Sequence, residues 1–258
     1  MALNRTPIEW VKNPDGTQGY TWNPITGCLN GCPYCYARKL ANGRLKSRYL
    51  ANKNLAPFPS LDYSDNPQSY PPNNPFYPRF WEDRLLQIQN APKNSGIFVC
   101  DMSDLFGIGI PEDWTEDVLS EISLCEDCRF YLLTKQPQNL PKWSPFPSNC
   151  QVGITATNYT MLAYALEYLK GIQASVKYVS LEPMLERMNI PLLDKVFINC
   201  GIKQVIIGAQ TKPTVMPKIE WVEEIEAAAR KAGIAIFEKD NLRPLLSREL
   251  IQEVPNAP

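Results

Sequence analysis

Three cysteines near the N-terminus have the residue type and the spacing to hold a metal cluster. Cys28, Cys32 and Cys35 lie in the string CLNGCPYC, at intervals of four and three residues. A short loop that leads into a helix aims such thiolates at one point, and Gly31 lets the loop turn tightly. The helix N-terminus stabilises the negative charge of the bound cluster. Three thiolates match three iron corners of a [4Fe-4S] cubane, and the fourth iron stays open for a small molecule.

Two other interpretations of the cysteines remain open. The three thiols are also three of the four ligands of a structural zinc site, or buried thiols without a metal. The chain has no histidine, so a fourth zinc ligand would be a distant cysteine or a carboxylate. Cys125 and Cys128 form a separate CEDC pair, a spacing that suits metal or redox chemistry. We interpret this pair as reduced structural thiols, because it precedes a predicted strand and so lies at the end opposite the first motif.

The composition predicts one domain spanning residues 1–258. The chain is 44% hydrophobic with a formal net charge of −1, which suits a sizeable core. The balanced charge gives no whole-molecule signal for nucleic acid, although it leaves room for a local basic groove. The opening MALNRTPIEW is not a signal peptide, and no apolar run is long enough for a membrane span. Together with eight cysteines, these features predict a cytoplasmic protein with reduced thiols and no membrane partner.

Short apolar, β-branched runs recur after residue 96 and predict the strands of a parallel sheet. They are almost continuously apolar, which is typical of strands buried on both faces. A first strand is expected over Tyr20 to Ile25. The later runs are Ile97–Cys100, Phe130–Leu133, Val152–Ile154, Val176–Leu181, Val205–Ile207 and Ile234–Phe237.

Helical patterns alternate with these runs. Helices are expected from about Pro33 to Leu50, after Pro111, after Asn158, and from Trp221 to a C′ residue at Gly233. Repeated β–α units with right-handed crossovers predict an α/β fold, a partial (β/α)6 TIM-like barrel of parallel strands, with a doubly wound open sheet as the alternative. In either fold the functional face lies at the carboxyl ends of the strands.

Residues 54–79 differ from the rest of the chain in composition. Seven prolines fall in this segment, and proline at that density excludes regular helix and interior strand. We expect an irregular insertion, either a functional loop or a passive surface excursion.

The sequence around the cysteines resembles the radical S-adenosylmethionine (SAM) superfamily. The CxxxCxxC arrangement with Tyr34 before its last cysteine is similar to the superfamily signature. The wider string TWNPITGCLNGCPYCYARKLA resembles a branch associated with phages and prophages. Further strings match that branch over most of the chain, with the proline-rich insertion as the main gap: IEW, IFVCDMSDLF, YLLTKQPQNL, VGITATN, VSLEPML, VIIGAQT and IFEK.

The resemblance implies a set of SAM-binding residues at the top of the barrel. Tyr34 matches the aromatic position near adenine. The segment from Asp101 to Asp104 matches the place of the motif that holds the methionyl amine, although its wording departs from the usual Gly-Gly-Glu, so this role follows from position alone. The expected SAM contacts are Tyr34, Asp101, Ser103, Asp104, Thr155, Ser180, Glu182 and Gly208.

Turn and loop chemistry offers an alternative for three of these residues. Asp101 and Asp104 are also suited to capping a helix or a turn, and Glu182, before Pro183, is also suited to a solvated loop. Without histidine, proton transfers would use other side chains. Lys135, Glu182, Glu238 and Lys239 are candidates because they end predicted strands or lie just beyond them.

The resemblance implies an enzyme with a [4Fe-4S] cluster and SAM as cofactors and an electron donor as partner. Its reaction would be the reductive cleavage of SAM, which starts radical chemistry on a substrate that the sequence does not identify. A nucleic acid or nucleotide substrate is weakly favoured by the phage association. Two alternatives remain: a non-catalytic binding protein that keeps the cluster as structure, and a zinc-stabilised nucleic-acid-binding module.

Overall fold

The computed structural model describes residues 3–59 and 70–255, and in these residues eight strands form one curved sheet. The strand order is β1-β2-β5-β6-β7-β8-β9-β10. All neighbours are parallel except β1 and β2. The strands are β1 Asn4–Arg5, β2 Tyr20–Trp22, β5 Gly96–Val99, β6 Arg129–Thr134, β7 Cys150–Thr155, β8 Val176–Leu181, β9 Ile202–Ile207 and β10 Ala235–Glu238.

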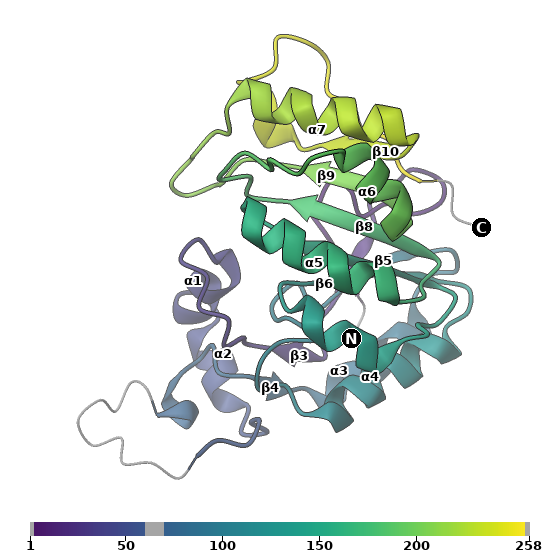
Figure 1. Cartoon of the computed structure of the whole chain (residues 1–258). Coiled ribbons are helices and arrows are strands. Elements are labelled where there is room, and N and C mark those ends of the chain that lie inside the picture. Colours follow the sequence, from purple (N-terminus) through teal and green to yellow (C-terminus); the bar gives the residue numbers. More distant parts are fainter. Residues whose placement is uncertain (1–2, 60–69, 256–258) are drawn as a thin grey trace.

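The long helices cover the outer face of this sheet (Figure 1). They are α4 Glu112–Leu124, α5 Tyr159–Gly171, α6 Leu193–Cys200 and α7 Ile219–Ala232. Outward strand residues such as Val99 and Leu132 pack with helix residues such as Leu162 in one large core. Asn158 caps α5 by accepting a hydrogen bond from the Met161 N–H at 2.8 Å.

The inner face is covered by the N-terminal segment rather than by helices. Trp10 and Val11 pack against the alternate strand residues Phe98, Tyr131 and Tyr178. The Trp10 ring lies 5.4 Å from Phe98 and 5.6 Å from Tyr131, both edge to face. Burial of both sheet faces explains the almost continuously apolar strand sequences. Because the long helices share one face, the α/β fold is the predicted partial barrel and not a doubly wound sheet. Its linear strand order leaves it open between β1 and β10.

The predicted first strand divides at Pro24. β2 ends at Trp22, and the chain then leaves the sheet to form β3 Ile25–Thr26, which pairs antiparallel with β4 Arg79–Phe80. The expected helix from Pro33 to Leu50 also divides, into α1 Tyr36–Asn42 and α2 Lys46–Ala51. Gly43 ends α1 because its N–H bonds the carbonyls of the last turn and glycine has a low helix propensity.

The base of the proline-rich insertion is built around one buried cation. The Arg79 side chain is fully buried and donates hydrogen bonds to the carbonyl oxygens of Asn52 at 2.7 Å, Asn74 at 2.9 Å and Pro72 at 3.3 Å. The 3-10 turn η1 Pro71–Asn73 lies here. The described part of the insertion contains this turn and the first residue of β4, and it is packed around Arg79. Residues 60–69 of the insertion lie outside the described residues.

The remaining short elements connect these layers. They are α3 Glu82–Leu85, η2 Leu86–Asn90, η3 Pro137–Trp143 and η4 Asp240–Leu242. Gly233 ends α7 with a left-handed φ of 67°, as predicted. Within the described ranges, no helix combines the length and the apolar character that a membrane crossing needs.

Candidate functional site

The three clustered cysteines lie in the loop between β3 and α1, and each sulfur accepts an N–H. The Asn30 main chain donates to Cys28 Sγ at 3.4 Å, and the Asn30 side chain donates to Cys32 Sγ at 3.3 Å. The Arg38 main chain donates to Cys35 Sγ at 3.3 Å. All three cysteines are free and partly exposed. Hydrogen bonds of this kind stabilise thiolate ligands, so the loop has the donor chemistry that a cluster site requires.

The residue before the first cysteine fixes the position of the loop. Gly27 donates its N–H to Met102 O at 2.9 Å and accepts from Ser103 Oγ at 2.5 Å, which ties the loop to the segment after β5. Its φ of 87° is left-handed, and an added Cβ would lie 2.4 Å from Tyr77 O. Only glycine fits this close approach without displacing backbone.

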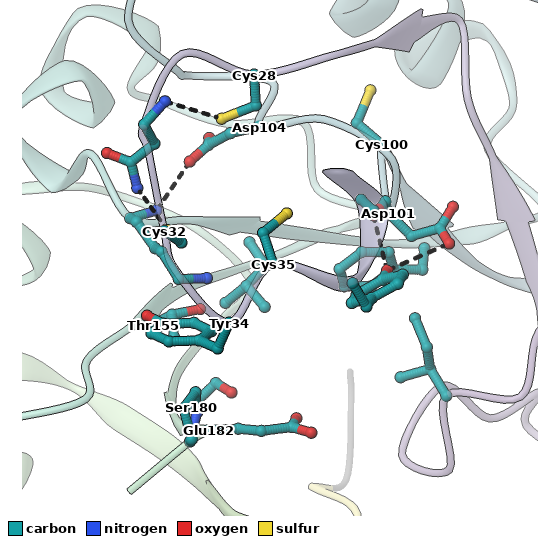
Figure 2. A pocket seen from close by; sticks show the side chains of 18 of the residues that line it. Cys28, Cys32, Tyr34, Cys35, Cys100, Asp101, Asp104, Thr155, Ser180 and Glu182 are labelled. Atoms are coloured by element: carbon teal, nitrogen blue, oxygen red, sulfur yellow. Dashed lines mark hydrogen bonds between the residues drawn. The ribbon is translucent and has the colours of Figure 1, made fainter. Parts of the chain in front are cut away.

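A cavity of about 290 Å³ opens at the carboxyl ends of the strands, and the cysteine loop forms one of its walls. Figure 2 shows the labelled side chains from the loop and the strand ends around this space. The structure therefore brings together residues that are more than 150 positions apart in the sequence. Besides the three cysteines, the predicted residues that line the cavity are Tyr34, Asp101, Ser103, Asp104, Thr155, Ser180 and Glu182.

Asp101 lies directly after β5 and its bonds hold it at the cavity wall. Its carboxylate accepts hydrogen bonds from Asn23 Nδ2 and, at 3.4 Å, from the Tyr36 hydroxyl, which also donates to the Asp101 main-chain carbonyl at 2.7 Å. Burial raises the pKa of Asp101, while the bonds from Asn23 and Tyr36 oppose that shift. The carboxylate is thus fixed by a side chain from the β2–β3 turn and faces the cavity from the cysteine side.

Asp104 combines a cavity position with the turn role that we gave as its alternative. Its Oδ1 accepts from Phe106 N at 3.2 Å within its own turn, and its Oδ2 accepts from Lys135 N at 3.0 Å. Burial raises the pKa of Asp104, and the backbone bond from Lys135 opposes the shift. Asp104 therefore joins the β5 loop to the β6 loop beneath the cysteines.

The opposite wall carries hydroxyls and an ion pair. Thr155 and Ser180 are register partners at the ends of β7 and β8. Glu182, just after β8, forms an ion pair with Lys239, which follows β10. This pair shares the wall with the hydroxyls, so Glu182 is a bonded cavity residue rather than the solvated loop residue of the alternative interpretation.

Gly208 lies beside this ion pair rather than on an open face of the cavity. An added Cβ would lie 3.1 Å from Glu182 Cγ and 3.1 Å from Lys239 Cδ. The space next to this glycine is therefore filled by two side chains of the chain itself. The SAM contact expected at Gly208 from the resemblance stays a prediction.

Glu238 does not line the cavity. It is fully buried at the end of β10, where its carboxylate accepts two bonds from Arg248, each at 2.7 Å, and one from Ile251 N at 2.7 Å. The prediction that Glu238 is a candidate for proton transfer at the cavity is wrong. Adjacent strand residues point in opposite directions, so Glu238 points away from the cavity that Lys239 lines. Lys135 and Lys239, by contrast, both line the cavity.

Sequence reasoning missed Asn30 and Trp10, which line the cavity, and Gln136, which bonds Asn30. Asn30 bonds Cys32 on one side and Gln136 on the other, which links the cysteine loop to the β6 loop. Trp10 contributes to the apolar floor, and its buried Nε1 has no hydrogen-bond partner among the described residues. The strings IEW and YLLTKQPQNL contained Trp10 and Gln136, but only their resemblance drew attention to them.

The thiols differ in their surroundings. Burial raises the pKa of the Cys28 thiol to about 12, so this group is protonated until a metal replaces the proton.

Cys125 and Cys128 pack near the start of β6, each with its thiol 3.8 Å from a carbonyl oxygen, at the end of the sheet opposite the cavity. In the described part of the chain, no three Cys, Asp or Glu side chains are grouped around the position of one metal ion.

Burial also raises the pKa of Tyr34 to about 12, and the neighbouring Cys32 adds to the shift. The phenol of Tyr34 is therefore protonated over the physiological range and presents an O–H donor and a ring to the cavity.

Comparisons with known proteins identify a family and a fold. No curated protein matches the chain. One similar solved structure is "Spore photoproduct lyase complexed with dinucleoside spore photoproduct". It has 11% sequence identity and a TM-score of 0.50, over 92% of this chain and 81% of that one. A cysteine-to-alanine variant of the same lyase, also with dinucleoside spore photoproduct, has 12% identity and a TM-score of 0.48 over the same shares. Residues 5–242 match the model of a protein family. The chain therefore belongs to the family described as "Protein of unknown function (DUF5131)".

Proposed function

We propose that this protein is a radical SAM enzyme with a [4Fe-4S] cluster held by Cys28, Cys32 and Cys35. One observation carries the proposal: the three thiols line the same cavity as the polar residues at the ends of the parallel strands β5, β6, β7, β8 and β10. Three thiolates leave one cluster iron for SAM. The partial barrel supports the proposal, because spore photoproduct lyase, a radical SAM enzyme, has the same type of fold.

When bound, the cluster supplies the electron that cleaves the sulfonium of SAM. The chain's own residues would bind and orient the groups around that bond. Asp101 and Asp104 offer carboxylates on the cysteine side, and Thr155, Ser180 and Glu182 offer acceptors on the opposite wall. Tyr34 offers its ring and an O–H donor.

A nucleotide or nucleic acid is the substrate class that we favour. The fold neighbour was solved with a dinucleoside photoproduct. The Trp10 ring lines the cavity, and its Nε1–H has no partner among the described residues, which suits a ligand with a flat apolar ring and a hydrogen-bond acceptor, such as a base. The reaction also needs an electron donor, and we expect it to take place in the cytoplasm, where thiols stay reduced. The association with phages stays a prediction.

Anaerobic reconstitution followed by incubation with SAM and a strong reductant tests the proposal. We expect iron and sulfide close to the content of one [4Fe-4S] cluster per chain, and formation of 5′-deoxyadenosine. A triple variant with Cys28→Ala, Cys32→Ala and Cys35→Ala should lose both. The matched control carries Cys125→Ala, Cys128→Ala and Cys200→Ala, which removes three thiols away from the cavity, and should keep both.

Two outcomes would contradict the proposal. A colourless protein that binds zinc through the same cysteines would support the zinc-stabilised module. A protein with a full cluster that neither binds nor cleaves SAM would support the non-catalytic binding protein.

A further inference from the structure

The helices next to the cysteine loop carry an excess of positive charge. We call residues 36–53, which contain α1 and α2, the basic arm. The sequence has no Asp or Glu between Asp15 and Asp62. All six Lys and Arg residues of this long stretch fall in the arm: Arg38, Lys39, Arg44, Lys46, Arg48 and Lys53. The charge of the nearly neutral chain is therefore strongly segregated.

The cations of the basic arm form no ion pair within the described residues, whereas cations on other elements do, such as Arg187 with Glu224. Five of the six are exposed, and Arg38 is half-buried. Arg44 lies in the turn between α1 and α2, and Lys46 is the first residue of α2. Both are exposed and have no side-chain hydrogen bond among the described residues. An exposed group of unpaired like charges costs free energy through mutual repulsion, and a polyanion removes that cost.

The basic arm is a packed part of the structure. Ala37, Ala41 and Tyr49 form a small core with Phe76 and Met102. The Tyr49 ring also lies 5.8 Å from the Trp81 ring. Because the backbone of the arm is held by this core, the positions that carry its cations are fixed, and binding a partner requires no ordering of this backbone.

The basic arm begins at the mouth of the cavity. The Arg38 guanidinium donates to Cys28 O at 3.3 Å, and Lys39 Nζ donates to Lys212 O, beyond the end of β9, at 2.6 Å. Tyr36 lines the cavity with 51% of its surface exposed, and its hydroxyl is fixed by Asp101 O at 2.7 Å. An exposed, immobilised aromatic ring thus lies between the cavity and the first cations of the arm.

We infer that the basic arm binds the sugar–phosphate backbone of a nucleic acid and leads it to the cavity mouth. That the bound nucleic acid is a substrate rests on the proposed function, but the binding itself does not depend on SAM cleavage. Proteins that bind single strands combine cations, which meet the phosphates, with an exposed aromatic ring, on which a base stacks. Tyr36 is the only large apolar residue exposed within the described basic arm. A surface with a single exposed apolar side chain is unsuited to membrane insertion.

Fluorescence anisotropy with a labelled single strand of about 20 nucleotides, and its duplex, tests this inference on the reconstituted full chain. If four cations contact phosphates of a single strand, affinity falls about 50-fold between about 50 and about 200 mM salt. The double variant Arg44→Gln/Lys46→Gln removes two contacts. It should weaken binding about 25-fold at about 0.1 M salt and make the salt slope less steep by about 1.4.

The matched control is Lys170→Gln/Lys195→Gln, which removes two exposed cations from the outer helices α5 and α6. It should change affinity by less than about twofold, since surface charges far from a site contribute little. Binding of either nucleic acid that the arm variant weakens and the control does not would support the inference. Absence of binding at low salt, or equal effects of the two variants, would overturn it. Equal affinity for polyglutamate of the same charge, or for anionic lipid vesicles, would also overturn it.

Discussion

The buried carboxylate of Glu238 gives a prediction that separates structural from catalytic roles. Arg248 binds both oxygens, with distances of 2.7 Å, and Ile251 N binds Oε2 at 2.7 Å. Although burial alone raises the pKa of this group, the bonds from Arg248, Glu226 and Ile251 hold it below its usual value. These contacts attach the C-terminal segment to the end of β10.

Replacement of Glu238 by glutamine keeps the shape of the side chain but turns an acceptor into a donor. In one orientation of the amide, donors from Arg248 and Ile251 would face the new nitrogen, and in the other a donor from Arg248 would face it. A hydrogen bond to a charged group contributes about 1.5–3 kcal/mol. Because the Arg248 side chain is 39% exposed, water compensates part of the loss, and we expect Glu238→Gln to lower the free energy of unfolding by about 3 kcal/mol.

Urea denaturation followed by circular dichroism measures this change. For an m-value of about 3 kcal/mol/M, the midpoint should fall by about 1 M. The control Glu249→Gln, at an exposed neighbour, should stay within about 0.5 kcal/mol of the parent chain. The cluster content of Glu238→Gln should be unchanged, because Glu238 does not line the cavity. A midpoint equal to that of the control, or a loss of cluster, would refute the structural role.

Three further predictions follow from particular contacts. Burial and the adjacent carboxylate raise the pKa of Glu226 to about 7, so its contribution to stability is present below its unfolded pKa and is lost as pH rises through about 7. In urea titrations between about pH 5 and pH 8, the free energy of unfolding of Glu226→Gln should therefore rise by on the order of 2 kcal/mol relative to that of the parent chain. Gly27→Ala should lower the iron content per chain after reconstitution, because the added Cβ meets backbone. Gly31→Ala, with open space at φ 73°, should lower the free energy of unfolding by only about 1 kcal/mol and keep the iron, and equal iron in both variants would contradict the anchoring role of Gly27. Trp10→Ala should cost about 3–5 kcal/mol, because the ring fills the inner face of the sheet, and a loss under about 1 kcal/mol would show that this packing is unimportant.

The strands were predictable because burial on two faces leaves a strong sequence pattern. The run Val176–Leu181 coincides with β8, and the run at 152–154 lies within β7. The apolar pattern alone did not reveal the break after Trp22, since Ile25 is as apolar in the small second sheet as it would be in the large one, but Pro24 within the run was a signal of it. Helix α6 was also missed, although Gly201, with its left-handed φ of 68°, marks its end.

The cavity was predictable where chemistry depends on local spacing or on strand ends. The cysteine motif and the polar residues after the strands meet at one place because parallel strands present their carboxyl ends together. Contacts between distant segments were beyond sequence reasoning, as for Asn30 and Gln136. Glu238 was misplaced because the position of a residue after a run of apolar residues does not reveal the direction of its side chain.

Electron paramagnetic resonance of the reduced, reconstituted protein tests the central claim most directly. The account predicts the signal of a [4Fe-4S] cluster that changes on addition of SAM, because the iron without a cysteine ligand takes up SAM, and it predicts that 5′-deoxyadenosine then accumulates. A cluster signal that SAM leaves unchanged, with no 5′-deoxyadenosine formed, would contradict it.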